Sequence, residues 1–149
     1  MIEIRLASEF DVADITEFQI KMAYETENIK LEHNTVTKGV ASVFRDPQKG
    51  KYYVAIEDGK IISSLLITHE WSDWRNSWVY WIQSVYVIPE KRGQGVFKQM
   101  YNHILDAVNN NSEVAGLRLY VDISNLAARK VYKKIGMNGD HYQVFEWMK

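Results

Sequence analysis

The amino-acid sequence predicts an α/β protein in which helices cover one mixed sheet. Two strand-like runs flank Asp58-Gly59, which is a strong β-hairpin signal. A third strand-like run stops at Pro89 and is followed at once by a glycine turn and an amphipathic helix. Strand and helix patterns then alternate to the end of the chain. An antiparallel meander that leads into a β-α-β unit makes the sheet mixed.

The first part of the chain is expected to hold one strand and two helices. Residues 2–6 alternate between apolar and other side chains, as in a short strand. Asp11 is placed to cap a helix whose apolar positions follow the helical period. Residues 24–34 are acidic and non-periodic, so they are expected to form a surface connection. Residues 36–44 carry apolar side chains at helical spacing, and Asp46-Pro47 ends this second helix.

The remaining elements complete the order β-α-α-β-β-β-α-β-α-β. Strands are expected at residues 51–57, 60–67, 78–88, 116–121 and 142–148, and helices at residues 96–108 and 125–135. The strand face that carries Trp81 and Gln83 is expected to carry Val85 and Val87 as well. Residues 71–77 are expected to form a tryptophan-bearing connection. No repeat or linker interrupts the pattern, which predicts one domain over residues 1–149.

Composition excludes several classes of protein. A hydrophobic content of 46% and a charged content of 25% are typical of a soluble globular domain. The net charge of −1 argues against a nucleic-acid binder, and the absence of cysteine excludes disulfides and thiolate chemistry. The sequence contains no signal-peptide pattern and no membrane-spanning run, so a cytoplasmic location is expected. The histidines lack metal-ligand spacing, and no metal is predicted.

Residues 83–97 are the strongest functional signal. An apolar strand is followed by Arg92-Gly93-Gln94-Gly95 and then by the start of a helix. The first N–H groups of a helix have no acceptor within the helix, and the helix dipole makes that end attractive to anions. Glycine lets a phosphate approach the backbone, and Arg92 adds a fixed positive charge. The segment therefore predicts a site for a phosphorylated ligand.

Two motifs resemble those of one known family. Residues 85–97 resemble the acyl-CoA-binding motif Arg/Gln-x-x-Gly-x-Gly/Ala of the Gcn5-related N-acetyltransferase (GNAT) superfamily, with Arg92 in the first place and Gly95 in the fourth. Phe97 stands in the sixth place, where the family has Gly or Ala. Residues 121–137 resemble a second family motif, Asn-x-x-Ala-x-x-x-Tyr-x-x-x-Gly-Phe/Met. The resemblance covers the whole element order and implies the GNAT fold and acetyl-CoA as cofactor.

The resemblance also implies roles for individual residues. The main chain at Val85, Tyr86 and Val87 would pair with the pantetheine arm as an added strand does. The turn and helix start would cradle the pyrophosphate through Arg92, Gly93, Gln94, Gly95, Val96, Phe97 and Lys98. Asn125 would contact the cofactor arm and Tyr132 would protonate the departing thiolate. Purely structural roles remain open: the glycines as a turn, Asn125 as a helix cap, and Tyr132 as a core side chain.

Acetyl transfer to an amine needs a base, because a lysine-like amine has a pKa of about 10.4 and is mostly protonated at neutral pH. Family members commonly carry a carboxylate on the fourth strand where this chain has Gln83, which cannot accept a proton. The nearby candidates are Glu25, Glu27, Glu70 and Asp73. The family's acceptor site lies beside the first helix connection, which favours Glu27 as the base. Each of these carboxylates could instead be a solvated surface charge.

The acceptor is expected to be a primary amine of a small molecule or a protein, bound with acetyl-CoA in a ternary complex. Its expected contacts are Glu25, Trp71, Asp73, Trp81 and Gln83, because carboxylates and tryptophans suit a cationic or aromatic amine. The tryptophans could equally pack under the loop or form a homodimer contact. Two alternatives stay open: a non-catalytic acyl-CoA-binding or sensing module, and a mononucleotide-binding protein, although no Gly-x-x-x-x-Gly-Lys-Ser/Thr motif occurs.

Overall fold

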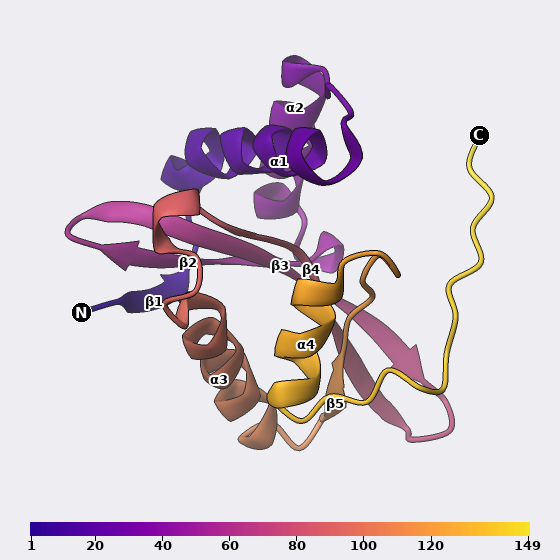
Figure 1. The fold of residues 1–149 in the computed structure, drawn as a ribbon. Coiled ribbons are helices and arrows are strands. Elements are labelled where there is room, and N and C mark those ends of the chain that lie inside the picture. Colours follow the sequence, from indigo (N-terminus) through magenta and orange to yellow (C-terminus); the bar gives the residue numbers. More distant parts are fainter. The chain divides into compact units, whose positions relative to one another are not determined.

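The computed structural model describes residues 1–149, which form two compact units. The first, Met1–Arg118, holds the sheet and three helices, and we call it the sheet unit. The second, Leu119–Lys149, holds one helix, and we call it the C-terminal unit. Figure 1 shows the elements of both.

The sheet unit contains a five-stranded sheet in the order β1-β2-β3-β4-β5. Neighbouring strands are antiparallel from β1 to β4, and β5 runs parallel to β4. The mixed sheet and the meander are therefore as predicted. The strands are β1 (Glu3–Leu6), β2 (Lys51–Glu57), β3 (Lys60–Ser72), β4 (Ser77–Val87) and β5 (Val114–Arg118).

Two hairpins build the meander. Asp58 and Gly59 link β2 to β3 with φ values of 49° and 75°, the left-handed conformations that a tight hairpin turn requires. The second hairpin is longer than predicted, because β3 and β4 continue until Ser72 pairs with Ser77. Trp71 and Trp78 are opposite each other, with ring centroids 5.1 Å apart. This cross-strand contact favours strand over loop and leaves residues 73–76 as the turn.

Helices cover both faces of this sheet (Figure 1). On one face lie α1 (Val12–Glu27) and α2 (His33–Arg45), and on the other lies α3 (Val96–Asn109). The core between the sheet and the first two helices contains Ile15, Val40, Tyr52 and Val54. None of the helices is long and apolar enough to cross a membrane.

The connection between the first two helices is shorter than predicted. The helix α1 continues to Glu27 and ends at Asn28, whose φ of 53° is left-handed. Glu32 caps α2 by accepting hydrogen bonds from the main-chain N–H groups of Asn34 and Thr35. Residues 28–32 therefore form the whole connection. The acidic composition was typical of a loop, but Glu25 and Glu27 lie within α1 and Glu32 caps α2.

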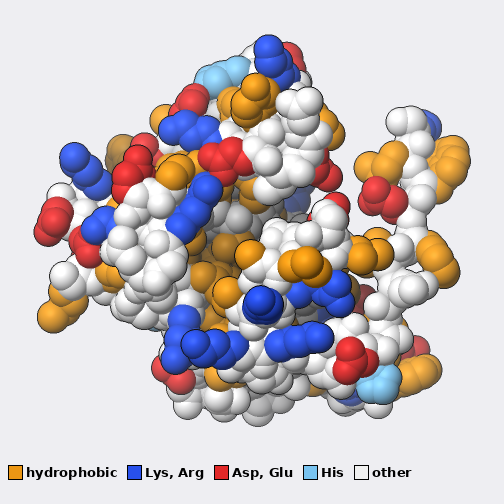
Figure 2. Space-filling view, viewed as in Figure 1, with side chains coloured by type: hydrophobic (Ala, Val, Ile, Leu, Met, Phe, Trp, Pro, Cys, Tyr) orange, Lys and Arg blue, Asp and Glu red, His pale blue; other side chains and the backbone are white.

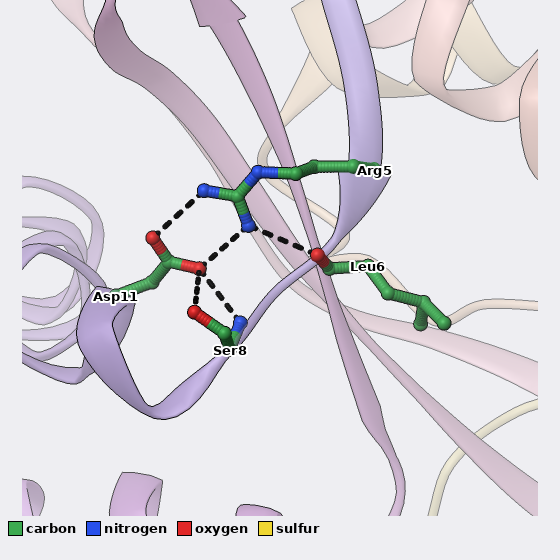
Figure 3. A network of polar contacts seen from close by, with 4 residues as sticks. All are labelled: Arg5, Leu6, Ser8 and Asp11. Atoms are coloured by element: carbon green, nitrogen blue, oxygen red, sulfur yellow. Dashed lines mark hydrogen bonds and ion pairs between the residues drawn. The ribbon is translucent and has the colours of Figure 1, made fainter.

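Asp11 does not cap α1 through its side chain, contrary to the prediction. Its carboxylate turns back toward β1 and accepts hydrogen bonds from the Arg5 guanidinium at 2.7 and 3.0 Å (Figure 3). The main-chain N–H of Ser8 donates to the same carboxylate at 2.7 Å. Because the charged form accepts these bonds, chiefly from Arg5, the pKa of Asp11 is lowered. The cluster ties the start of α1 to β1.

The C-terminal unit contains α4 (Leu126–Lys134). Asn125 caps this helix: its Oδ1 atom accepts from the N–H of Ala128 at 3.1 Å. Gly136 follows the helix with a φ of 95°, as a helix stop requires. The predicted last strand, residues 142–148, is not formed, since residues 135–149 contain no helix or strand. Alternation predicts which way side chains would point, but a strand also needs a partner, and β5 pairs with β4 alone.

Candidate functional site

A bulge in β4 divides the strand into two parts. Gln83 is paired with Leu66 and Tyr86 with Ser64, so Ser84 and Val85 together stand opposite one residue. Ser84 adopts a left-handed φ of 52°. The extra residue shifts the alternation, so Tyr86 joins Trp81 and Gln83 on the sheet face covered by α1. Val85 and Val87 consequently do not share that face, and the prediction that they did was wrong.

Beyond the first part of β4, its outer edge is open. The pairing between β4 and β5 covers only Trp78 to Trp81. From Ile82 onward no strand pairs with that edge, and Val85 and Val87 lie within this stretch. An open edge offers main-chain N–H and C=O groups to an extended ligand. The Val87 carbonyl also accepts a hydrogen bond from Nε of Arg92 at 2.9 Å.

The glycine turn follows directly at the end of β4. Gly93 and Gly95 have φ values of 74° and 77°, which side chains other than glycine rarely adopt. No heavy atom lies within 4 Å of the place where a Cβ would stand at either residue, so the backbone there is open. Gly95 is the N-cap of α3 and supplies no side-chain cap to its first N–H groups. An open turn beside an uncapped helix start can accept an anion.

Phe97 fits this arrangement despite its size. The residue lies in the first turn of α3, and its ring is 6.2 Å from that of Tyr101, one turn further along the helix. Its side chain therefore packs along α3, while its main-chain N–H remains in the first turn. Val96 beside it is buried and anchors the helix start, whereas Lys98 is exposed.

Three side chains from separate elements meet beside the turn. Arg92 forms an ion pair with Glu25 near the end of α1, with 2.7 Å between Nη2 and Oε2. The hydroxyl of Tyr86 on β4 donates to the other carboxylate oxygen of Glu25 at 3.2 Å. The guanidinium carbon of Arg92 lies 5.3 Å from the centroid of the Tyr86 ring. Burial and the charge of Glu25 raise the pKa of Tyr86. We call this set the Glu25 cluster.

Comparison with protein families identifies the chain. The model described as the acetyltransferase (GNAT) family matches residues 11–137. The chain belongs to the GNAT acetyltransferase family. This match includes both the glycine turn and the segment from Asn125 to Met137. Membership makes the protein an acetyltransferase whose acetyl donor is acetyl-CoA.

Solved structures share the fold of this GNAT protein. A possible acetyltransferase from Clostridium difficile 630 is 38% identical, with a TM-score of 0.92 over 100% of this chain and 98% of that one. A predicted acetyltransferase with acetyl-CoA from Clostridium acetobutylicum is 19% identical, with a TM-score of 0.75 over 98% and 96% of the two chains. A ribosomal-protein-alanine N-acetyltransferase from Brucella melitensis biovar Abortus 2308 is 15% identical, with a TM-score of 0.82 over the whole of both chains. Comparison with curated proteins found no match.

The residues expected to bind the acceptor occupy different places in this GNAT chain. Trp81 and Gln83 lie on the sheet face covered by α1, where Gln83 donates a hydrogen bond to the hydroxyl of Thr68. Trp71 lies on the opposite face, where its ring packs against Trp78. Asp73 lies in the hairpin turn, and its Oδ1 atom accepts from the N–H of Trp74 at 3.0 Å. The structure therefore brings together only part of the expected set.

The candidate bases also differ in their surroundings. Glu25 belongs to the Glu25 cluster, and Glu70 forms an ion pair with Arg118 of β5 at 2.6 Å. Glu27 is exposed at the last position of α1 and takes part in none of the ion pairs. Figure 2 shows acidic and basic side chains next to one another over α1, α2 and the turn before α3. Two residues that sequence reasoning did not select contact predicted site residues: Thr68 accepts a hydrogen bond from Gln83, and Arg118 pairs with Glu70.

Two expected site residues lie in the C-terminal unit. Asn125 is the N-cap of α4, so at least one bond of its side chain serves the helix. Tyr132 lies within α4 and is half-buried, and burial raises the pKa of its hydroxyl. A tyrosine hydroxyl is protonated at neutral pH, as a proton donor must be.

Proposed function

We propose that this GNAT protein transfers an acetyl group from acetyl-CoA to a primary amine by direct transfer in a ternary complex. One observation carries the proposal: an open glycine turn with two left-handed residues lies between the unpaired edge of β4 and the uncapped start of α3. A backbone anion site beside an open strand edge suits a ligand with a pyrophosphate and an extended amide-bearing arm.

The roles in cofactor binding follow from the positions of these residues. The N–H groups at the start of α3, in Val96, Phe97 and Lys98, would bind the pyrophosphate oxygens together with Gly93, Gln94 and Gly95. The guanidinium of Arg92 would add its charge. The main chain of Val85, Tyr86 and Val87 would pair with the pantetheine arm along the open edge of β4. Asn125 would contact the same arm.

Bound acetyl-CoA supplies a thioester whose acetyl carbon forms a bond to the amine nitrogen while its bond to sulfur breaks. The chain has to remove a proton from the ammonium form of the acceptor and deliver one to the leaving sulfur. Glu27 would take the first proton, directly or through water, since Glu25 and Glu70 are held in ion pairs. Tyr132 would give a proton to the sulfur and would regain one from the nitrogen as the amide forms.

Acceptor binding would involve Trp81 and Gln83, which lie on one face of β4. Gln83 is bonded to Thr68 and would orient the acceptor or a water molecule rather than take up a proton. Trp71 and Asp73 lie at the hairpin between β3 and β4, which is at the other end of β4 from the glycine turn. They would contact only an extended acceptor, such as a protein segment. A cationic amine suits the carboxylates and indole rings of this set.

Thiol release from acetyl-CoA across a panel of amines tests the function. The panel contains polyamines, aromatic amines, aminoglycosides, lysine peptides and peptides with an N-terminal alanine. We expect at least one amine to raise thiol release above the rate of hydrolysis without acceptor. Tyr132→Phe should lower kcat with that amine while coenzyme A binding is retained. If acetyl-CoA does not bind at tens of micromolar, the cofactor assignment is contradicted. If Tyr132→Phe turns over at the wild-type rate, the proton-donor role of Tyr132 is contradicted.

A further inference from the structure

The Glu25 cluster joins parts of the sheet unit that are far apart in sequence. Glu25 lies near the end of α1 and Arg92 lies 67 residues later, at the start of the glycine turn. Both oxygens of the Glu25 carboxylate are engaged, one by Arg92 at 2.7 Å and one by the Tyr86 hydroxyl at 3.2 Å. Tyr86 is itself held, because its ring packs against Phe18 of α1 with centroids 5.0 Å apart.

The contacts of Arg92 fix its direction. Its Nε donates to the carbonyl of Val87, its Nη2 donates to Glu25, and its guanidinium lies over the ring of Tyr86. An arginine side chain carries five N–H donors, so these two bonds leave donors for a further anion. The side chain of Arg92, which directly precedes the glycine turn, is thus held in one direction. Rotamer freedom that is lost on folding need not be lost again when a ligand binds.

We propose that Glu25 is a positioning residue for the cofactor: its carboxylate holds Arg92 toward the pyrophosphate site. This inference rests on the proposed function, in which the glycine turn binds coenzyme A. It assigns to Glu25 a role on the cofactor side, in place of the acceptor contact expected from the sequence. It also makes α1, whose last residue is the proposed base Glu27, a direct neighbour of the cofactor loop.

The sign of the expected effect separates positioning from simple charge. Glu25 is negative and so is a pyrophosphate, so removing the charge of Glu25 without any positioning role should tighten coenzyme A binding. Loss of positioning should weaken it. The two accounts therefore predict opposite changes in the same measurement.

Calorimetric titration with coenzyme A, on a double-mutant cycle of Glu25→Gln and Arg92→Gln, tests the proposal. We expect Glu25→Gln alone to weaken binding by about three- to fivefold, the range of a partly exposed ion pair. In the Arg92→Gln background the same change should no longer weaken binding, because there is no guanidinium left to position. Glu17→Gln removes one negative charge elsewhere on α1 and should leave the affinity unchanged.

The outcomes separate the inference from the function on which it rests. If coenzyme A binds the wild-type protein but Glu25→Gln binds it equally or more tightly, the positioning role is wrong. An equal effect of Glu25→Gln with and without Arg92 also contradicts it, because Glu25 would then act on another partner. If the wild-type protein does not bind coenzyme A, the proposed function itself fails. Thermal unfolding of each variant is the control for the fold. We expect the fold to be retained, since Glu25 and Arg92 are both partly exposed on the surface.

Discussion

Two ion pairs hold α1, one at each end, and their surroundings differ. At the start of the helix, Asp11 pairs with Arg5 at 2.7 Å, and the carboxylate is only 7% exposed whereas the Arg5 side chain is 36% exposed. Near its end, Glu25 pairs with Arg92 at the same distance, but the two side chains are 36% and 46% exposed. A buried carboxylate depends strongly on its partners, because it has lost most of its contact with water. The Asp11 pair therefore supports the fold, whereas the Glu25 pair leaves its arginine accessible to a ligand.

Breaking the pair that contains the buried Asp11 carboxylate should have the largest effect. We expect Asp11→Asn to lower the free energy of unfolding by about 2–3 kcal/mol, since hydrogen bonds to a charged, buried carboxylate are lost. Urea unfolding measures this change. Asp14→Asn, one turn further along the same helix, is the matched control and should change stability by less than about 0.5 kcal/mol. A small effect of Asp11→Asn would remove the contrast between the two ends of α1.

The pH dependence of stability should identify the same carboxylate. Arg5 and Ser8 lower the pKa of Asp11 in the folded protein, so the folded state holds its proton less tightly than the unfolded state. The stabilisation is therefore present above the ordinary pKa of 3.8 and is lost as the pH falls through the lower folded value. Urea titrations at several acidic pH values should show a steeper loss for the wild type than for Asp11→Asn. Equal slopes would mean that another carboxylate dominates.

Breaking the exposed pair from the arginine side should change binding and not stability. We expect Arg92→Gln to weaken coenzyme A binding by about tenfold, because a charged hydrogen-bond donor to phosphate is lost. Its unfolding free energy should stay within about 0.5 kcal/mol of the wild type, as for other exposed pairs. Arg45→Gln, at the end of α2, is the control that removes the same charge away from the turn. A large loss of stability in Arg92→Gln would mean that the ion pairs at both ends of α1 stabilise the fold, which would contradict the contrast between them.

The smallest expected effect comes from Tyr86, which contacts both Glu25 and Arg92. Tyr86→Phe keeps the ring under Arg92 but removes the hydroxyl that donates to Glu25. We expect coenzyme A affinity to fall by about twofold, in line with one neutral hydrogen bond to a partly exposed carboxylate. Calorimetry at the same ionic strength as for Arg92→Gln measures it. An effect larger than that of Arg92→Gln would place the Tyr86 hydroxyl, rather than the Arg92 guanidinium, at the centre of the cluster.

Much of the sheet unit could be predicted from local patterns. The hairpin at Asp58-Gly59 and the helix after Gly95 depend on left-handed conformations that glycine signals directly. The second hairpin, Trp71 to Trp78, was predicted too short because cross-strand packing lies outside any local window. The bulge at Ser84 gave no local signal either, since serine rarely adopts a positive φ. The face assigned to Val85 and Val87 was wrong for that reason.

The candidate site likewise has one part that local sequence predicted and one part that it did not. The glycine turn was predictable because its chemistry belongs to consecutive backbone groups. The pairing of Glu25 with Arg92 joins residues from two elements, and no periodicity or spacing in the sequence indicates it. The predicted strand at residues 142–148 depends on a partner that a pattern of alternation cannot supply.

A crystal structure with acetyl-CoA tests the central claim most directly. We expect the pyrophosphate oxygens within about 3 Å of the main-chain N–H groups at the start of α3, with Arg92 donating to them and still paired with Glu25. The pantetheine arm should run along the open edge of β4 beyond Ile82. A pyrophosphate bound away from the turn at Gly93 and Gly95, or an arm that avoids β4, would contradict the account.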